Sequence, residues 1–298
     1  MSEKKQRLSL DEISLKKWVG LVVVDIALGY LVAAVFGVVL QVMNIGGEWA
    51  WLTDTLTTYI AFASLFLFFM LFLRTICKTT LRDFLVGEGK MIDWRQTVVI
   101  GALYAAGFLI GAFLFSDFGR NLTLNDADVT VILVNLILAL AFTWVQTTWE
   151  ELVFRGVALR WACGNKIRVC SRSLIAAFVI SAVFMLGHIA NPEVTSQANV
   201  ADIAASCFYY FFVGFLMYMA DLVFGDLMPG CAIHWVNNFM SFAVINQVGT
   251  ALQAQSFVID HTPVVGTTSL VGAVVTYLPV IVYTAYHWKK RSASVAEA

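Results

Sequence analysis

Charged residues are scarce in this chain of 298 residues and make up only 13% of it. A soluble domain of this size would carry roughly a quarter. The shortage excludes an ordinary soluble enzyme. A hydrophobic share of 60% and a mean hydropathy of +0.80 indicate a polytopic membrane protein instead. The net charge of −1 gives no sign of a nucleic-acid partner, and we expect none.

Signals of several other protein classes are also lacking. The five cysteines have no CxxC or paired spacing, which argues against a disulfide framework or a cysteine metal site. The His-Glu-x-x-His helix of soluble zinc proteases does not occur. We expect no cleavable signal peptide and no C-terminal prenylation motif. An internal repeat is missing too, which weakens a secondary-transporter interpretation because those folds often contain duplicated halves.

Long apolar runs, by contrast, are abundant. About 20 apolar residues cross a bilayer as a helix. By that measure we expect eight spans, and the seventh is short and partly polar. They lie at roughly 18–43, 54–73, 97–117, 130–158, 173–190, 200–222, 230–247 and 266–288.

These spans predict an all-α polytopic membrane protein with about eight transmembrane helices. We expect residues 18–288 to form a single transmembrane domain, because no linker or low-complexity segment interrupts it. A basic tail at 1–17 and a short tail at 289–298 would flank this domain on the cytoplasmic side.

The distribution of lysine and arginine predicts the orientation of the spans. Seventeen of the 19 lie in the two tails and after the second and fourth spans, which share one side if the number of spans is even. Arg120 falls on the opposite side, and Arg155 falls within the membrane. Lysine and arginine gather in cytoplasmic loops. We therefore expect both termini in the cytoplasm.

The segment 149–156 is the most informative part of the sequence, because it brings two acids and an arginine into an apolar run. Ionisable groups inside a membrane are costly unless they are paired or face a polar cavity, so they indicate a functional site. Glu151 and Arg155 lie four residues apart and can form an ion pair. Glu150 points about 100° away from Glu151. We assign the pair to structure. A structural network needs only one acid for its arginine, so we assign the remaining acid, Glu150, to catalysis.

Three more polar residues lie in other spans. His188 ends the stretch Phe184–His188 in the fifth span, whereas His234 and Asn238 lie four residues apart in the seventh. A lone histidine on an apolar helix is usually a packing residue, but two histidines, an acid pair and an amide together favour chemistry. Their expected depths differ by about two helical turns. A tilt, or a re-entrant segment at 221–230, would reconcile them near the middle or in the cytoplasmic half of the membrane.

These side chains suit the activation of water for attack on an amide carbonyl. A buried carboxylate is a competent general base, a histidine can share the water, and a second histidine and an amide can donate to the oxyanion. Glu and two His also form a known zinc ligand set, which here would be Glu150, His188 and His234. Asn238 is a poor zinc ligand and a good oxyanion donor, so we favour a mechanism without metal.

Two other classes of function stay open. The chain could be a non-catalytic membrane protein with an immunity or secretion accessory role. It could also be a proton-coupled transporter, for which Asp25 in the first span adds a candidate site. A transporter predicts activity that follows the proton gradient, whereas a protease does not.

Three motifs occur in order on separate spans: Glu-Glu-x-x-x-Arg at 150–155, Phe-x-x-x-His at 184–188 and His-x-x-x-Asn at 234–238. Phe-Arg-Gly at 154–156 extends the first motif. The pattern resembles the CPBP family of CAAX proteases and bacteriocin-processing proteins, which includes the type II CAAX prenyl endopeptidases. The resemblance covers about residues 130–247, which would form the catalytic core.

The resemblance implies an eight-helix intramembrane endopeptidase. In it, Glu150 and His188 would activate water, and His234 and Asn238 would hold the oxyanion. The family has been described both as metalloprotease and as metal-free glutamate protease, so the cofactor would be either zinc or none.

The resemblance also bears on supporting residues, partners and location. The supporting residues would be Glu151, Arg155 and Phe184. The substrate would be a membrane-embedded or lipid-modified peptide or protein, and the bilayer itself is a partner. Some bacterial members are linked to bacteriocin immunity, so a prenylated substrate does not follow. We expect a multi-pass protein of a prokaryotic plasma membrane, and the sequence leaves its oligomeric state open.

Overall fold

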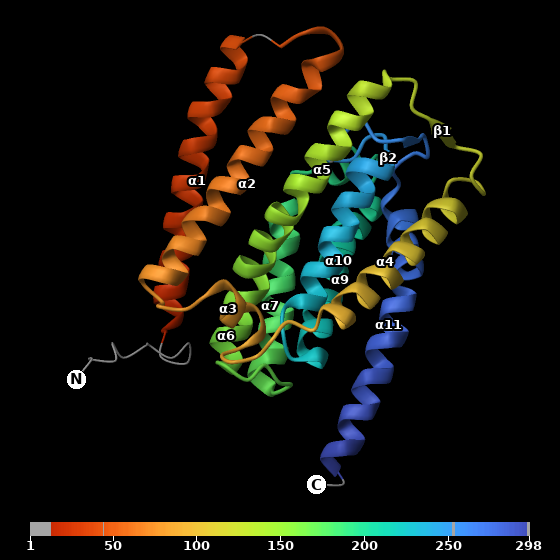
Figure 1. Cartoon of the computed structure of the whole chain (residues 1–298). Coiled ribbons are helices and arrows are strands. Elements are labelled where there is room, and N and C mark those ends of the chain that lie inside the picture. The colour runs from red at the N-terminus through yellow and green to blue at the C-terminus, as the bar shows by residue number, and fades with distance from the viewer. Residues whose placement is uncertain (1–12, 44, 252–253, 297–298) are drawn as a thin grey trace.

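The computed structural model describes residues 13–43, 45–251 and 254–296. Residues 1–12 of the expected basic tail and residues 297–298 of the expected C-terminal tail lie outside the described residues. The described chain consists mainly of helices that pack side by side (Figure 1). Six of them are long and apolar enough to cross a membrane. The protein is therefore an all-α polytopic membrane protein, as the sequence predicts.

The elements follow one another along the chain in this order. The helices are α1 Leu15–Met43, α2 Ala50–Thr75, α3 Leu81–Val86, α4 Trp94–Phe115, α5 Val129–Glu150, α6 Val157–Cys163, α7 Ser171–His188, α8 Pro192–Thr195, α9 Val200–Phe224, α10 Met228–Phe239 and α11 Gly266–Ala296. Further turns are the 3-10 helix η2 Gly47–Trp49 and the π-helices η3 Glu151–Gly156 and η4 Met240–Val244. The strands are β1 Leu122–Leu124, β2 Ile245–Gln247 and β3 Val258–Asp260.

Each of the eight expected spans coincides with a helix. The six helices that meet the length and hydropathy of a membrane span are α1, α2, α4, the continuous α5–η3–α6 unit, α9 and α11. The other two expected spans correspond to helices that do not meet this measure: α7 is apolar but short, and α10 has 12 residues. The last three residues of the seventh expected span form strand β2 instead of helix.

A small three-stranded sheet covers one end of the helix bundle (Figure 1). Strand β3 lies in the middle, antiparallel to β1 and parallel to β2, with Leu122 opposite Asp260 and Ile245 opposite Val258. Each strand has three residues. That is too short for the alternation of apolar and polar residues by which a strand is recognised in a sequence.

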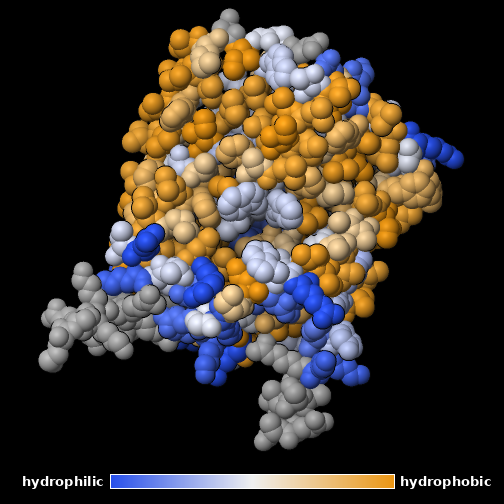
Figure 2. All heavy atoms as spheres, in the orientation of Figure 1, coloured by the Kyte–Doolittle hydropathy of each residue, from blue (hydrophilic) through white to orange (hydrophobic). Residues whose placement is uncertain are grey.

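The two ends of the bundle differ in charge. Helix α1 begins and α11 ends at the same end (Figure 1). We call this the basic end and define it by the loops 76–93 and 164–170 with the adjoining helix termini. The opposite end, which we call the sheet end, comprises the segments 116–128, 189–199, 245–251 and 254–265. Figure 2 shows an apolar belt between the two and hydrophilic residues gathered along the lower, basic edge.

A buried cluster near the basic end joins the N-terminal helices to the rest of the bundle. The ring of Trp18 on α1 lies 5.5 Å from that of Phe84 on α3, and both are fully buried. The buried guanidinium of Arg160 on α6 donates through Nε to the carbonyl of Phe84 at 2.8 Å. These contacts fix α6, and with it the lower part of the α5–η3–α6 unit that carries the acidic motif.

Candidate active site

The two adjacent glutamates lie where helix geometry changes. Glu150 is the last residue of α5, and Glu151 is the first residue of the π-helix η3. The backbone N–H of Val157 donates to the carbonyl of Leu152, five residues earlier, which is the π pattern. Single π turns inside α-helices occur frequently at functional sites. Both glutamates are buried, with 7% exposure for Glu150 and none for Glu151.

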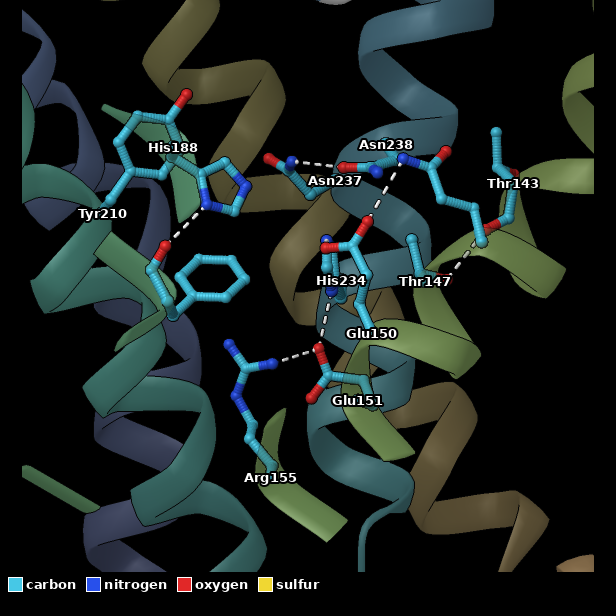
Figure 3. Close-up of polar contacts among 12 residues, drawn as sticks. Thr143, Thr147, Glu150, Glu151, Arg155, His188, Tyr210, His234, Asn237 and Asn238 are labelled. Atoms are coloured by element: carbon cyan, nitrogen blue, oxygen red, sulfur yellow. Dashed lines mark hydrogen bonds and ion pairs between the residues drawn. The ribbon is translucent and has the colours of Figure 1, made fainter. Parts of the chain in front are cut away.

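Glu151 connects Arg155 to His234. Nη1 of Arg155 donates to Oε1 of Glu151 at 2.5 Å, which is the ion pair that the spacing predicts. The same oxygen lies 2.6 Å from Nδ1 of His234 on α10 (Figure 3). The sequence did not reveal this second contact, because it joins residues 83 positions apart. Glu151 therefore supports the predicted site directly, through one of its histidines.

The hydrogen bond to Glu151 fixes the proton on one nitrogen of His234. An ionised carboxylate only accepts hydrogen bonds, so Nδ1 of His234 carries a proton and donates. The other ring nitrogen, Nε2, lies 3.7 Å from Oε2 of Glu150. His234 thus presents Nε2 toward Glu150, and it can donate from that nitrogen only as imidazolium.

Helix α10 approaches η3 closely at Gly230. A Cβ atom on this glycine would lie 2.8 Å from Oε2 of Glu151 and 2.8 Å from Oδ2 of Asp221. The backbone N–H of Gly230 donates to Oδ1 of Asp221 at 2.7 Å. Helix α9 stays helical through Phe224, and the chain then turns at Gly225, whose φ of 83° favours glycine. The expected re-entrant segment at 221–230 is thus a tight turn between two helices, and it brings His234 beside both glutamates.

Two residues outside the recognised motifs orient Asn238. The hydroxyl of Tyr104 on α4 donates to Oδ1 of Asn237 at 2.7 Å, and Nδ2 of Asn237 donates to Oδ1 of Asn238 at 3.0 Å. Because the oxygen of Asn238 is engaged, its amide nitrogen remains to donate into the site. The sequence held only a weak signal for Asn237, its position next to Asn238, and none for Tyr104.

His188 lies on the other side of the site, on α7. Its Nδ1 is 2.7 Å from the carbonyl oxygen of Phe184, which can only accept, so Nδ1 carries the proton and Nε2 of the neutral ring bears a lone pair. Tyr210 on α9 stacks on the imidazole with ring centres 4.4 Å apart. The Tyr210 hydroxyl donates to Glu193 and accepts from Asn191 at 2.9 Å. In Figure 3 the second ring nitrogen of His188 faces the side on which Glu150 and Asn238 lie.

Phe184 fills the space between the two histidines. Its ring centre lies 4.3 Å from that of His188 and 6.2 Å from that of His234. The guanidinium of Arg155 lies 4.8 Å from the same ring centre, within the range of a cation–π contact. The phenylalanine of the second motif thus packs against members of all three motifs.

A cavity of about 750 Å³ joins these groups. Glu150, His188, His234 and Asn238 all line it, and so does Phe184. Gln146, one turn before Glu150, donates to Oε1 of Glu150 at 3.3 Å. Glu151 and Arg155 are not among the lining residues. The four expected catalytic residues therefore share one cavity, and the expected ion pair lies behind its wall.

Asp25 lies apart from this cavity. It is fully buried in α1, and its Oδ2 accepts a hydrogen bond of 2.7 Å from the indole N–H of Trp149. It does not line the cavity, although its neighbour Ile26 does. The structure therefore makes Asp25 a buried, hydrogen-bonded link between α1 and the end of α5.

The zinc set considered from the sequence does not assemble as a ligand group. Within the described part of the chain, no three His, Cys, Asp or Glu side chains lie close enough to hold one metal ion. His188 is on α7, across the cavity from Glu150 and His234 (Figure 3). The donors in this arrangement do not fit a zinc site, so we derive no step through a metal.

Comparison with known proteins gives one match. Residues 131–240 match the family model described as Type II CAAX prenyl endopeptidase Rce1-like. No curated protein and no solved structure matches the chain. The matched segment contains the acidic motif, the Phe184–His188 motif and the His234–Asn238 motif. In residues 131–240 the chain therefore carries an Rce1-like domain, the domain of CAAX-type intramembrane proteases.

Proposed function

We propose that this protein is an intramembrane endopeptidase in which Glu150 and His188 activate a water molecule for attack on a peptide bond. One observation carries the proposal. Glu150, His188, His234 and Asn238 come from three different helices, and all four line the same cavity among the membrane helices. A set of a base, two histidines and an amide around one cavity is suited to hydrolysis of an amide.

The first step is deprotonation of the water. Glu150 is the general base, held by the hydrogen bond from Gln146. His188 accepts the second hydrogen of the water through Nε2, because its Nδ1–H is engaged by the carbonyl of Phe184. The water oxygen attacks the carbonyl carbon of the substrate while its proton passes to Glu150. Two acceptors on one water orient its lone pair toward the substrate.

The second step is stabilisation of the oxyanion that forms on the carbonyl oxygen. Asn238 donates from Nδ2, since Asn237 occupies its oxygen. His234 donates from Nε2 as imidazolium, with Nδ1–H held by Glu151. With Glu150 and Glu151 ionised, the positive charges of Arg155 and an imidazolium at His234 make the cluster neutral. Charge balance of this kind is favoured in a site remote from bulk water.

The tetrahedral intermediate then collapses. The carbonyl forms again, the C–N bond breaks, and Glu150 returns its proton to the leaving nitrogen, which gives a carboxylic acid and an amine. The acid then passes its proton to the amine, so the products leave as a carboxylate and an ammonium group. Each group ends in the state in which it began. The sequence of steps needs no nucleophilic side chain.

The substrate that suits this cavity is a membrane-embedded or lipid-modified peptide or protein, with peptides related to bacteriocins included in the class. The protein would act in a prokaryotic plasma membrane. The Rce1-like match supports a protease of the CAAX type, and the four lining residues support hydrolysis as its chemistry.

Exchange of the base tests the proposal. In Glu150→Gln the side chain keeps its shape but cannot take a proton, so we expect a stably folded protein that no longer cleaves. New protein N-termini in the membrane fraction would be compared between cells with the wild-type chain and cells with Glu150→Gln. Glu88→Gln, the same change at an exposed position of the basic end, is the matched control. If wild type and Glu150→Gln gave the same set of N-termini while both were present at equal level, the proposal would be wrong.

A further inference from the structure

The cavity extends from the catalytic residues toward only one end of the bundle. Its deep part is lined by Glu150 and His234. From there the lining passes along the upper halves of α4, α9 and α11 to the loops of the sheet end, where it includes Gln247, Asp260 and Thr262. None of the described residues in the loops of the basic end, 76–93 and 164–170, belongs to the lining.

The charges of the two ends indicate which side of the membrane each one faces. Among the described lysines and arginines, only Arg120 lies at the sheet end, and Arg155 lies inside the bundle. The remaining ones all belong to the basic end: Lys16, Lys17, Arg74, Lys78, Arg82, Lys90, Arg95, Arg160, Lys166, Arg168, Arg172, Lys289, Lys290 and Arg291. Lysine and arginine near the ends of membrane helices mark the cytoplasmic side. The sheet end, and with it the mouth of the cavity, therefore faces away from the cytoplasm.

We propose that the substrate reaches the active site from the extracytoplasmic side, as an internal segment of an exported, membrane-anchored peptide or protein. The proposal rests on the function proposed above and names the substrate class of that same site. A substrate whose cleavage site stays in the cytoplasm would have to reach Glu150 past the basic end, whose described loops do not line the cavity.

The lining fits such a segment. Toward α1, α2 and α4 the cavity is bordered by aromatic and aliphatic side chains that suit a membrane anchor: Ile26, Tyr30, Phe62, Phe108 and Phe115. Tyr30 on α1 lines the cavity and is also 64% exposed, so we expect the cavity to border the lipid there.

The polar part of the lining decides between an internal segment and a chain terminus. The mouth carries the carboxylates Glu193 and Asp260, and the described lining includes no lysine or arginine. A free C-terminal carboxylate at the mouth would find no lysine or arginine to pair with and would meet two like charges. An uncharged stretch of peptide on both sides of the cleaved bond avoids this cost.

The side of the membrane from which an introduced cysteine can be modified tests the direction from which the cavity is reached. Ser241→Cys introduces a thiol into the cavity lining on η4, and Ser171→Cys introduces one at the exposed start of α7 at the basic end. Both exchanges replace one oxygen by sulfur. A small methanethiosulfonate with a trimethylammonium group, which does not cross membranes, is added to spheroplasts or to inverted membrane vesicles. Modification is measured as a mass shift of the purified protein, with the unaltered chain as background for its five native cysteines.

We expect Ser241→Cys to react in spheroplasts and not in inverted vesicles, and Ser171→Cys to do the opposite. Reaction of both thiols from the same side, or of Ser241→Cys from both sides or neither, would overturn the proposal. The measurement does not depend on proteolysis. If the expected labelling were found while Glu150→Gln left cleavage unchanged, the access route would stand and the proposed chemistry would fail.

Discussion

At the scale of single residues, the charges of the site meet at Glu151. One of its oxygens accepts from Arg155 and from His234, at 2.5 and 2.6 Å. Any change at Arg155 therefore acts on two things at once, the stability of the buried pair and the position of the imidazole. Arg155, which its helical spacing assigns to structure, is thus linked through Glu151 to His234, which we assign to catalysis.

Arg155→Ala should lower the stability of the protein markedly. Removing the guanidinium leaves the fully buried carboxylate of Glu151 without its counter-ion, which costs about 3–5 kcal/mol. We expect a lower midpoint of thermal unfolding in detergent, with activity lost as a consequence. Arg82→Ala is the control, since that arginine pairs with Asp83 but its side chain is 48% exposed, and such pairs contribute about 1 kcal/mol or less. Equal midpoints for the two variants would refute the structural role of the Arg155 pair.

Tyr104→Phe should reduce turnover without unfolding the protein. The exchange removes only the hydroxyl that donates to Asn237 and so frees the amide of Asn238 to rotate. Loss of one such hydrogen bond is worth about 1.4 kcal/mol, or roughly a tenfold decrease in kcat. The control is Tyr59→Phe. Tyr59 is buried, its hydroxyl has no hydrogen-bond partner among the described residues, and it does not line the cavity.

The hydrogen bonds from Tyr104 through Asn237 to Asn238 lead to a second expected result for Tyr104→Phe. In a chain that already carries Asn238→Ala, the hydroxyl of Tyr104 has nothing left to orient. Tyr104→Phe should then have no further effect on residual kcat, which is a non-additivity expected of residues that act as one unit. Multiplying effects in the double variant would show that Tyr104 acts independently of Asn238.

At the scale of helices and strands, the sequence predicts regular elements well and local departures poorly. Runs of apolar residues are long-range averages, so all eight expected spans coincide with helices. The π-helix Glu151–Gly156 depends on how backbone carbonyls shift by one position, for which composition carries no signal. The same holds for the strands, whose pairing joins residues far apart, such as Leu122 and Asp260.

The predicted site follows the same division. The motifs fixed which residues to consider, and their spacing along one helix gave the Glu151–Arg155 pair. The sequence did not predict the contacts between helices, namely those of His234 with Glu151, Tyr104 with Asn237 and Tyr210 with His188. Such contacts depend on the rotation and depth of packed helices, which the sequence constrained only to within about two turns.

Gly230→Ala should disturb the contact between α10 and η3. The added Cβ would lie 2.8 Å from oxygens of both Glu151 and Asp221, and Glu151 cannot move without releasing His234. We expect a loss of stability of about 1–3 kcal/mol, as for overpacking elsewhere, together with a decrease in activity. The control is Gly20→Ala on α1, where a Cβ meets nothing within 4 Å and the unfolding midpoint should stay the same or rise. A Gly230→Ala variant as stable and active as Gly20→Ala would contradict the close approach.

At the scale of the whole molecule, the catalytic cavity and the basic residues extend toward opposite ends of the bundle. The lysines and arginines gather at one end, whereas the cavity with Glu150 and His188 extends toward the other. The basic end is also where Arg160 and the Trp18–Phe84 contact tie α3, α6 and α1 together. One end therefore holds the helices and is expected to set their orientation, and the other gives access to the site.

The orientation of the molecule is the last prediction. The described part of the chain places 14 lysines and arginines at the basic end against Arg120 alone at the sheet end. Each of these charges resists transfer across the bilayer, and the bias sets topology.

We expect a phosphatase reporter that is active only outside the cytoplasm to be silent when fused after Ala298. It should also be silent when inserted beside Ile167, in the loop between α6 and α7, but active when inserted beside Ser196 after α8. Because the loop at Ile167 and the C-terminus are tested separately, an error in the number of spans would appear as disagreement between them. Activity at both of them, with silence at Ser196, would invert the molecule in the membrane and turn the mouth of the cavity toward the cytoplasm.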